Sequence, residues 1–101
     1  MKKAIRIEPE DNVAVVAQDT AAGETLECAG ERLTAKDAVP LGHKIALSRI
    51  PRGERIVKYA VTIGLASCDI APGAHVHSQN VEDITNRLCN EYERAFRAIK
   101  G

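Results

Sequence analysis

The spacing of hydrophobic residues along the chain changes once, near residue 81. Before that point, β-branched and aliphatic residues gather in short runs, which are typical of strands. Five such runs cover residues 4–7, 12–17, 43–47, 55–61 and 62–70. After it, hydrophobic residues recur every three or four positions, as on an amphipathic helix, at Ile84, Leu88, Tyr92, Ala95 or Phe96, and Ile99. The pattern predicts a mostly β domain over 1–80 and a C-terminal amphipathic α-helix over 81–101.

Turn signals separate the predicted strands and share one form, in which a small residue or proline comes before a glycine and a new strand follows. They lie at 21–23, 40–42, 51–53 and 72–73. Proline fixes φ and glycine adopts positive φ without strain, so each signal should reverse the chain sharply. Short strands joined in this way predict a compact β meander or small barrel. The helix could pack on that barrel or dock on a partner, and the sequence leaves both open.

Composition excludes several classes of protein. With 101 residues the chain can support one small core, and its zero formal charge and lack of Trp argue against a nucleic-acid-binding module. No apolar run approaches the ~20 residues of a membrane span, and no signal-type stretch follows the first lysines, so we expect a cytoplasmic protein. Cys28, Cys68 and Cys89 lack the close spacing of metal or redox motifs and should be free thiols.

Charge is unevenly distributed although the total cancels. Residues 8–37 are rich in acidic side chains, whereas residues 44–58 are rich in basic ones, including Arg49, Arg52 and Arg55. This basic segment is either a solvated edge or subunit contact, or a rim that attracts a carboxylate substrate, since arginine can grip a carboxylate with two hydrogen bonds.

The three histidines fall in strand-like segments. His75 and His77 are two residues apart, so on a strand they project from one face and could supply two nitrogen ligands to a metal if a third group converges on them. His43 shares alternation with Ile45 and could be that third group only if the two strands are neighbours. A hydrogen-bonded structural role for each histidine is the alternative.

At these residues the chain resembles a known family. The segments 11–15 (DNVAV), 40–47 (PLGHKIAL), 57–59 (VKY), 63–64 (IG) and 69–77 (DIAPGAHVH) are similar, in order and spacing, to the SAF domain that begins altronate dehydratases. The resemblance implies a β-clip fold. Related domains are known in galactarate dehydratase and in the small subunit of sulfolactate sulfo-lyase.

The resemblance also implies a function. It suggests the small subunit or N-terminal domain of a sugar-acid hydro-lyase, acting with a large catalytic subunit to turn an aldonate or aldarate into a 2-keto-3-deoxy acid. The family's divalent metal, Fe²⁺ or Mn²⁺, would be held mainly by the large subunit. The alternatives are a non-catalytic carbohydrate-acid binding or assembly module and a sulfo-lyase small subunit. A homo-oligomer is also compatible with the sequence.

Site residues follow from the matching positions. The resemblance assigns His75 and His77 to metal binding, and, with the basic segment, His43, Lys44, Arg49 and Asn80 to substrate binding. It assigns no catalytic residue.

Two positions depart from the family pattern. Gln79 stands where related sequences often have a further histidine, which shifts weight from metal ligation toward substrate hydrogen bonding. Ala60 stands where a glycine is common, which argues against positive φ at that position.

Overall fold

The computed structural model describes residues 1–82, and these form nine strands and no helix. In chain order the strands are β1 (Lys2–Ile5), β2 (Val13–Val16), β3 (Thr25–Cys28), β4 (Glu31–Thr34), β5 (Lys44–Ala46), β6 (Arg55–Lys58), β7 (Val61–Ala66), β8 (His75–Val76) and β9 (Val81–Glu82). The mostly β class predicted from the sequence is confirmed for this part of the chain.

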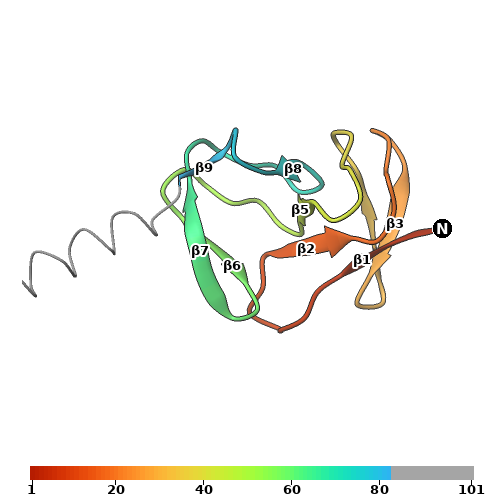
Figure 1. Ribbon diagram of the computed structural model, residues 1–101, viewed down its shortest axis with the longest axis horizontal. Helices are drawn as coiled ribbons and strands as arrows, with labels where there is room; N and C mark the ends of the chain where they lie inside the picture. The colour runs from red at the N-terminus through yellow and green to blue at the C-terminus, as the bar shows by residue number, and fades with distance from the viewer. Residues whose placement is uncertain (83–101) are drawn as a thin grey trace, which may run out of the picture.

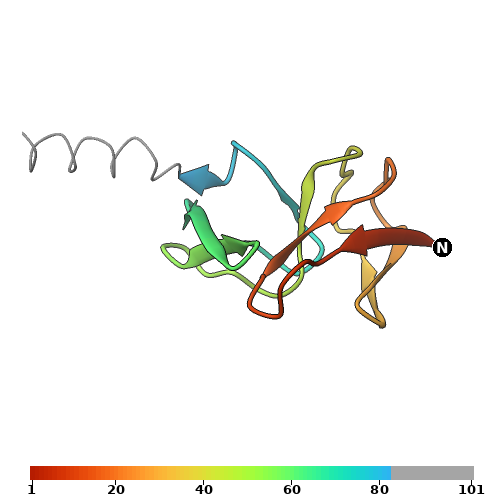
Figure 2. The same ribbon diagram turned by 60° about the horizontal axis from the view of Figure 1, so that its bottom comes forward.

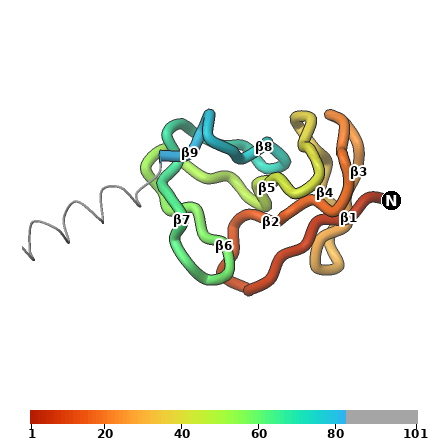
Figure 3. The backbone as a smooth tube through the Cα atoms, in the orientation of Figure 1, coloured from red at the N-terminus to blue at the C-terminus, as the bar shows by residue number. Residues whose placement is uncertain are grey.

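The strands form two sheets (Figure 1). One has six strands in the order β4-β3-β1-β2-β5-β8 and curls into a half barrel, and the other has three in the order β6-β7-β9. The pairing of β1 with β3 is parallel, while the other pairings between the described strands are antiparallel. The tube in Figure 3 shows β2, β5 and β8 between the β3–β4 hairpin on one side and the three-stranded sheet on the other.

The strands β2 and β5 are buried on both faces, so their alternating side chains enter two separate cores. The first core contains Ala14, Val16 and Ile45 together with side chains of β1 and β3. The second contains Val13 and Ala46 together with side chains of β6, β7 and β8. The described residues therefore have two small cores instead of the single core expected, joined through strands that belong to both.

Each core is closed by a hairpin whose base is tied by an isolated bridge. Thr20 pairs with Val39 below the β3–β4 hairpin, and Ile50 pairs with Ile70 below the β6–β7 hairpin. The two hairpins lie on opposite sides of the central strands, which is also visible in the turned view of Figure 2.

Asp11 fixes the turn of the β6–β7 hairpin. Its carboxylate oxygens accept hydrogen bonds from the backbone N–H groups of Ala60 at 2.8 Å and Tyr59 at 3.0 Å. Burial by itself raises the pKa of Asp11, but these backbone hydrogen bonds outweigh it and lower the pKa below the usual value. Both turn residues have positive φ, 56° and 58°. Positive φ is thus retained at Ala60, and the expectation drawn from the missing glycine is wrong.

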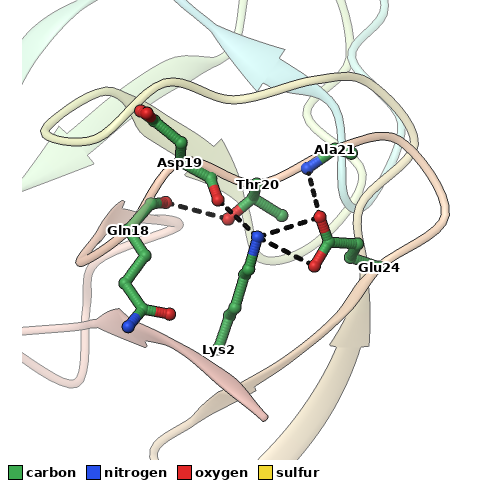
Figure 4. A network of polar contacts seen from close by, with 6 residues as sticks. All are labelled: Lys2, Gln18, Asp19, Thr20, Ala21 and Glu24. Atoms are coloured by element: carbon green, nitrogen blue, oxygen red, sulfur yellow. Dashed lines mark hydrogen bonds and ion pairs between the residues drawn. The ribbon is translucent and has the colours of Figure 1, made fainter.

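A polar network anchors β1 to the turn at residues 21–23 (Figure 4). The ammonium group of Lys2 donates to the backbone oxygen of Asp19 at 2.6 Å and pairs with the Glu24 carboxylate at 2.9 Å. Glu24 also accepts the N–H of Ala21 at 2.9 Å. The side chain of Lys2 and these hydrogen bonds lower the pKa of Glu24. This network is structural, since it ties the N-terminal strand to the first core.

The strands differ from the sequence prediction in three places. Strands β3 and β4 were not expected, because their mixed polar and apolar residues lack a β-branched run. The runs 55–61 and 62–70 are one hairpin, with its turn at residues 59–60. Val81–Glu82 form β9 and pair with β7, so they do not begin a helix; the rest of the predicted helix lies outside the described residues.

Two further expectations concern the thiols and the membrane. Cys28 is buried and Cys68 is exposed, and both are free thiols. Burial raises the pKa of the Cys28 thiol, which fits a small core residue. Within residues 1–82 no helix has the length and apolarity needed to cross a bilayer.

Candidate metal centre

The histidines converge where β5 and β8 run side by side. His43 directly precedes β5, His75 begins β8, and His77 directly follows it. The two strands are antiparallel, with Ile45 opposite His75 and Lys44 opposite Val76. The condition set by the sequence, that the strands carrying His43 and the His75/His77 pair be neighbours, is therefore met.

The three imidazole rings form one cluster. Nδ1 of His43 lies 2.9 Å from Nε2 of His75, a hydrogen-bond distance. The ring centroids are 4.3 to 5.5 Å apart, and the ring planes are within 25° of parallel. One nitrogen from each ring can be chosen so that all three lie within 4.8 Å of one another. Ring nitrogens from the neighbouring β5 and β8 segments thus lie close together.

The backbone of the histidine segment is held from two sides. Asn80 accepts the N–H of His77 at 3.0 Å through Oδ1 and donates to the carbonyl of His75 at 2.8 Å through Nδ2. The carboxylate of Asp37 accepts the N–H of His75 at 3.1 Å. Since β8 has only two residues and little pairing of its own, these bonds are needed to hold both histidines in place beside β5.

Burial and nearby charges favour the neutral form of His75. Burial lowers its pKa most, followed by the positive charge that His43 and His77 can carry, while Asp37 partly opposes these effects. A histidine with a lowered pKa is neutral at pH 7 and has a free lone pair, which is the form that binds metals.

The donor set fits a divalent transition metal. Two imidazole nitrogens on one tetrahedral ion, each ~2.0–2.1 Å from it, lie about 3.4 Å apart. The 2.9 Å between the His43 and His75 nitrogens would have to lengthen by about half an ångström to reach that value, whereas any separation near the 4.8 Å limit of the cluster would have to shorten by more than about 1 Å. Three imidazoles suit zinc, iron, nickel or copper, whereas manganese and magnesium prefer carboxylate oxygens. The histidines could therefore hold such an ion and leave further coordination positions to other ligands.

The structure does not bring all the predicted site residues together. Lys44 pairs directly with Val76, so its side chain shares the face of the second core, opposite to Ile45 and His75. Burial and the charge of Lys58 lower its pKa. Arg49 is exposed and forms an ion pair with Asp69 at 3.6 Å.

Asn80 uses both ends of its amide on the backbone, as described above. The substrate-binding roles expected for His43, Lys44, Arg49 and Asn80 stay predictions.

Two contributions were missed from the sequence. Asp37 reaches His75 from 38 positions away in the chain, and no local pattern indicates such a contact. The clamp made by Asn80 had only a general local signal, because asparagine side chains often bond backbone groups of nearby residues in turns.

The fold and the cluster define a small all-β domain with a candidate three-histidine metal site at the edge of its half barrel. Residues 2–84 match the family described as the altronate/galactarate dehydratase SAF domain, and the chain belongs to this family.

Relatives of known function include two altronate dehydratases. The chain is 43% identical to that of Bacillus subtilis across its whole length, and the aligned part is 22% of that protein. It is 42% identical to that of Escherichia coli over 75% of the chain and 15% of that protein. A (2R)-sulfolactate sulfo-lyase subunit alpha from Paracoccus pantotrophus is 45% identical over 48% of the chain and 73% of that subunit. The chain thus spans about a fifth or less of the dehydratases it matches.

Proposed function

We propose that this SAF domain is part of a sugar-acid hydro-lyase and holds a divalent metal ion through His43, His75 and His77. The observation that carries the proposal is the convergence of three imidazole nitrogens within 4.8 Å from two neighbouring strands. This extends the metal role expected for His75 and His77 to His43. An all-nitrogen donor set favours Fe²⁺ over Mn²⁺, which narrows the pair of metals implied by the family resemblance.

The reaction that we infer is the loss of water from an aldonate or aldarate. A proton leaves the carbon next to the carboxylate, hydroxide leaves the neighbouring carbon, and the resulting enol tautomerises to a 2-keto-3-deoxy acid with release of one water. A bound divalent ion would stabilise the negative charge that develops beside the carboxylate. The three imidazoles would supply the nitrogen ligands, while Asn80 and Asp37 hold the backbone around β8 and so position His75 and His77.

The base that removes the proton and most of the surface that binds the sugar acid would come from a large catalytic region. The dehydratases related to this chain have about four-fifths of their length outside the matched part. In this proposal the domain contributes ligands and positioning, and the basic segment with Lys44 and Arg49 forms a contact with the anionic substrate or with that region.

Metal binding can be measured directly on the 101-residue chain. Titration with Co²⁺, followed by its visible absorption and by calorimetry, should show one ion per chain. His43→Ala, His75→Ala and His77→Ala should each weaken binding at least about tenfold, because a ligand is lost. Ser78→Ala, an exposed neighbour in the same turn, is the matched control and should bind as the wild type does. Equal affinity in all four variants would refute the site.

A second candidate, a sulfo-lyase subunit, is favoured by one observation. The match to the sulfo-lyase alpha subunit covers 73% of that subunit, whereas the match to each dehydratase covers a minor part. The chain should be mixed with the large catalytic protein encoded nearest to it and assayed with altronate, galactarate and sulfolactate. Release of sulfite from sulfolactate alone would replace the hydro-lyase proposal; dehydration of a sugar acid alone would support it.

If no substrate turns over more slowly when this chain is omitted, the domain is a binding or assembly module without a part in the chemistry. In that case His77→Ala would leave turnover intact and change complex formation or substrate affinity.

A further inference from the structure

Gln79 contacts the side of the His75 ring that faces away from the cluster. Nε2 of His75 faces His43 at 2.9 Å, whereas Nδ1 of His75 lies 3.2 Å from the amide nitrogen of Gln79. The two nitrogens of this ring therefore have different partners. Gln79 cannot share a metal with Nε2 of His75 from this position, so its part in a metal centre would be indirect.

The contact with Gln79 determines which nitrogen of neutral His75 carries the proton. An amide nitrogen can only donate, so Nδ1 of His75 must accept and be unprotonated. The orientation of the amide is supported by its second contact, a hydrogen bond from the same nitrogen to the carbonyl of His75 at 3.3 Å. Rotating the amide would place two oxygens against each other there. The proton is thus on Nε2, where it is donated to Nδ1 of His43.

Metal binding requires the opposite arrangement. Nε2 is the His75 nitrogen that faces the cluster, and it needs a free lone pair to ligate. The proton must then sit on Nδ1, where it meets the N–H groups of the Gln79 amide. The clash is removed only if the amide rotates to present Oε1, which costs its hydrogen bond to the His75 carbonyl.

From this geometry we propose that Gln79 is a positioning residue that tunes metal affinity by setting the tautomer of His75. In the wild type its amide favours the metal-free tautomer and rotates when an ion binds. The inference rests on the proposed metal site and adds a regulator to it. A residue at this position that accepts a hydrogen bond from Nδ1–H would hold the ligating tautomer instead, as carboxylates behind metal-bound histidines do.

The test compares Gln79→Glu and Gln79→Leu with the wild type, and uses Ser78→Glu as a control with the same added charge on a neighbouring exposed residue. Co²⁺ affinity should rise about tenfold in Gln79→Glu beyond any rise in Ser78→Glu. Gln79→Leu should bind more tightly than the wild type but less tightly than Gln79→Glu, since it removes the opposing donor without adding an acceptor.

A second readout does not depend on metal affinity. Long-range ¹H–¹⁵N spectra should show the His75 proton on Nε2 in the metal-free wild type, on Nδ1 in metal-free Gln79→Glu, and on Nδ1 in the wild type after Zn²⁺ is added. Equal Co²⁺ affinity of Gln79→Glu and Ser78→Glu, or a proton on Nδ1 in the metal-free wild type, would overturn the role of Gln79. Absence of metal binding in every variant, with the metal-free tautomers as expected, would instead overturn the metal site.

Discussion

Replacing Gly73 with alanine should destabilise the protein far more than the same change at Gly53. Both glycines follow a proline-containing turn, and their φ angles are nearly equal, +84° and +86°. Each donates its N–H to a carbonyl at 2.8 Å, Gly73 to Ala46 and Gly53 to Ala66. They differ in the space around them. A Cβ at Gly53 meets no atom within 4 Å, whereas a Cβ at Gly73 collides with the backbone oxygen of Thr34.

The expected loss of unfolding free energy combines two costs, that of positive φ and that of the collision with Thr34. Positive φ costs a residue with a Cβ about 1–2 kcal/mol, and this cost applies to both variants. Overpacking adds about 1–3 kcal/mol, and it applies only to Gly73→Ala, because the obstructing atom is backbone and cannot turn away. Gly53→Ala should therefore lose about 1–2 kcal/mol of unfolding free energy and Gly73→Ala about 2–5 kcal/mol. In a domain of this size each kcal/mol lowers Tm by about 4–8 °C.

Urea denaturation followed by far-UV circular dichroism measures both values, and Co²⁺ titration adds a functional readout. Gly73 lies two residues before His75, and its carbonyl accepts the N–H of Lys36 at 2.8 Å, so the clash should displace the start of β8. Gly73→Ala should weaken metal binding while Gly53→Ala leaves it unchanged. Unfolding free energies that agree within about 0.5 kcal/mol would show that the loop carrying Thr34 yields freely, and would refute the reasoning.

Four further predictions test the turn of the β6–β7 hairpin, the clamp on β8 and the first core. Asp11→Asn should be less stable than the wild type at pH 7. Because the folded-state pKa of Asp11 is lowered from 3.8, its stabilising effect is complete above that value and is lost as the pH falls through the folded-state pKa. The urea midpoints of the two proteins should therefore approach each other in acid; a gap that does not shrink as the pH falls below 3.8 would contradict this. Ala60→Gly should raise the unfolding free energy by about 0.5–1 kcal/mol by relieving the positive φ, and a loss of stability would contradict it. Asn80→Ala should lower the unfolding free energy by about 1–2 kcal/mol and weaken Co²⁺ binding, since the two hydrogen bonds from the Asn80 side chain to the backbone are lost. Unchanged Co²⁺ affinity would show that the clamp does not position the histidines. Ile45→Ala, at a side chain with no exposed surface, should cost about 2–5 kcal/mol, and a thermal melt within 2 °C of the wild type would contradict that.

The sequence predicted the class of fold because turns and β-branched runs are local signals. It placed strands over most of β2, β5, β6 and β7 and identified the reversals at the glycine turns. It missed β3 and β4, whose stability comes from cross-strand pairing such as Leu26 with Leu33, and pairing between segments is not visible in either segment alone. It also missed the turn at Tyr59–Ala60, because the signal there is Asp11, almost 50 residues away.

The candidate site, too, was predicted only in part, because pairing between distant segments is not visible in local sequence. Alternation along one strand placed His75 and His77 on one face, and only the register of β5 with β8 could add His43. The same register separates Lys44 from the cluster, since neighbours in sequence on a strand point to opposite faces. The sequence prediction placed His43 and Lys44 in one site because they are adjacent in the chain, whereas the sheet places them on opposite faces.

The position of the cluster also bears on what this domain could contribute to the proposed hydro-lyase. Within residues 1–82 the carboxylate that acts on His75 is Asp37, and one of its oxygens is already bonded to the His75 backbone N–H. A second role as the base that removes a proton would neutralise this carboxylate and weaken the contact that positions a proposed ligand. The domain is better suited to hold an ion from one side than to carry out proton abstraction. The outer edge of β8, the last strand of the six-stranded sheet, is then the place where the catalytic region of the proposed enzyme would have to bring its own base and the remaining ligands.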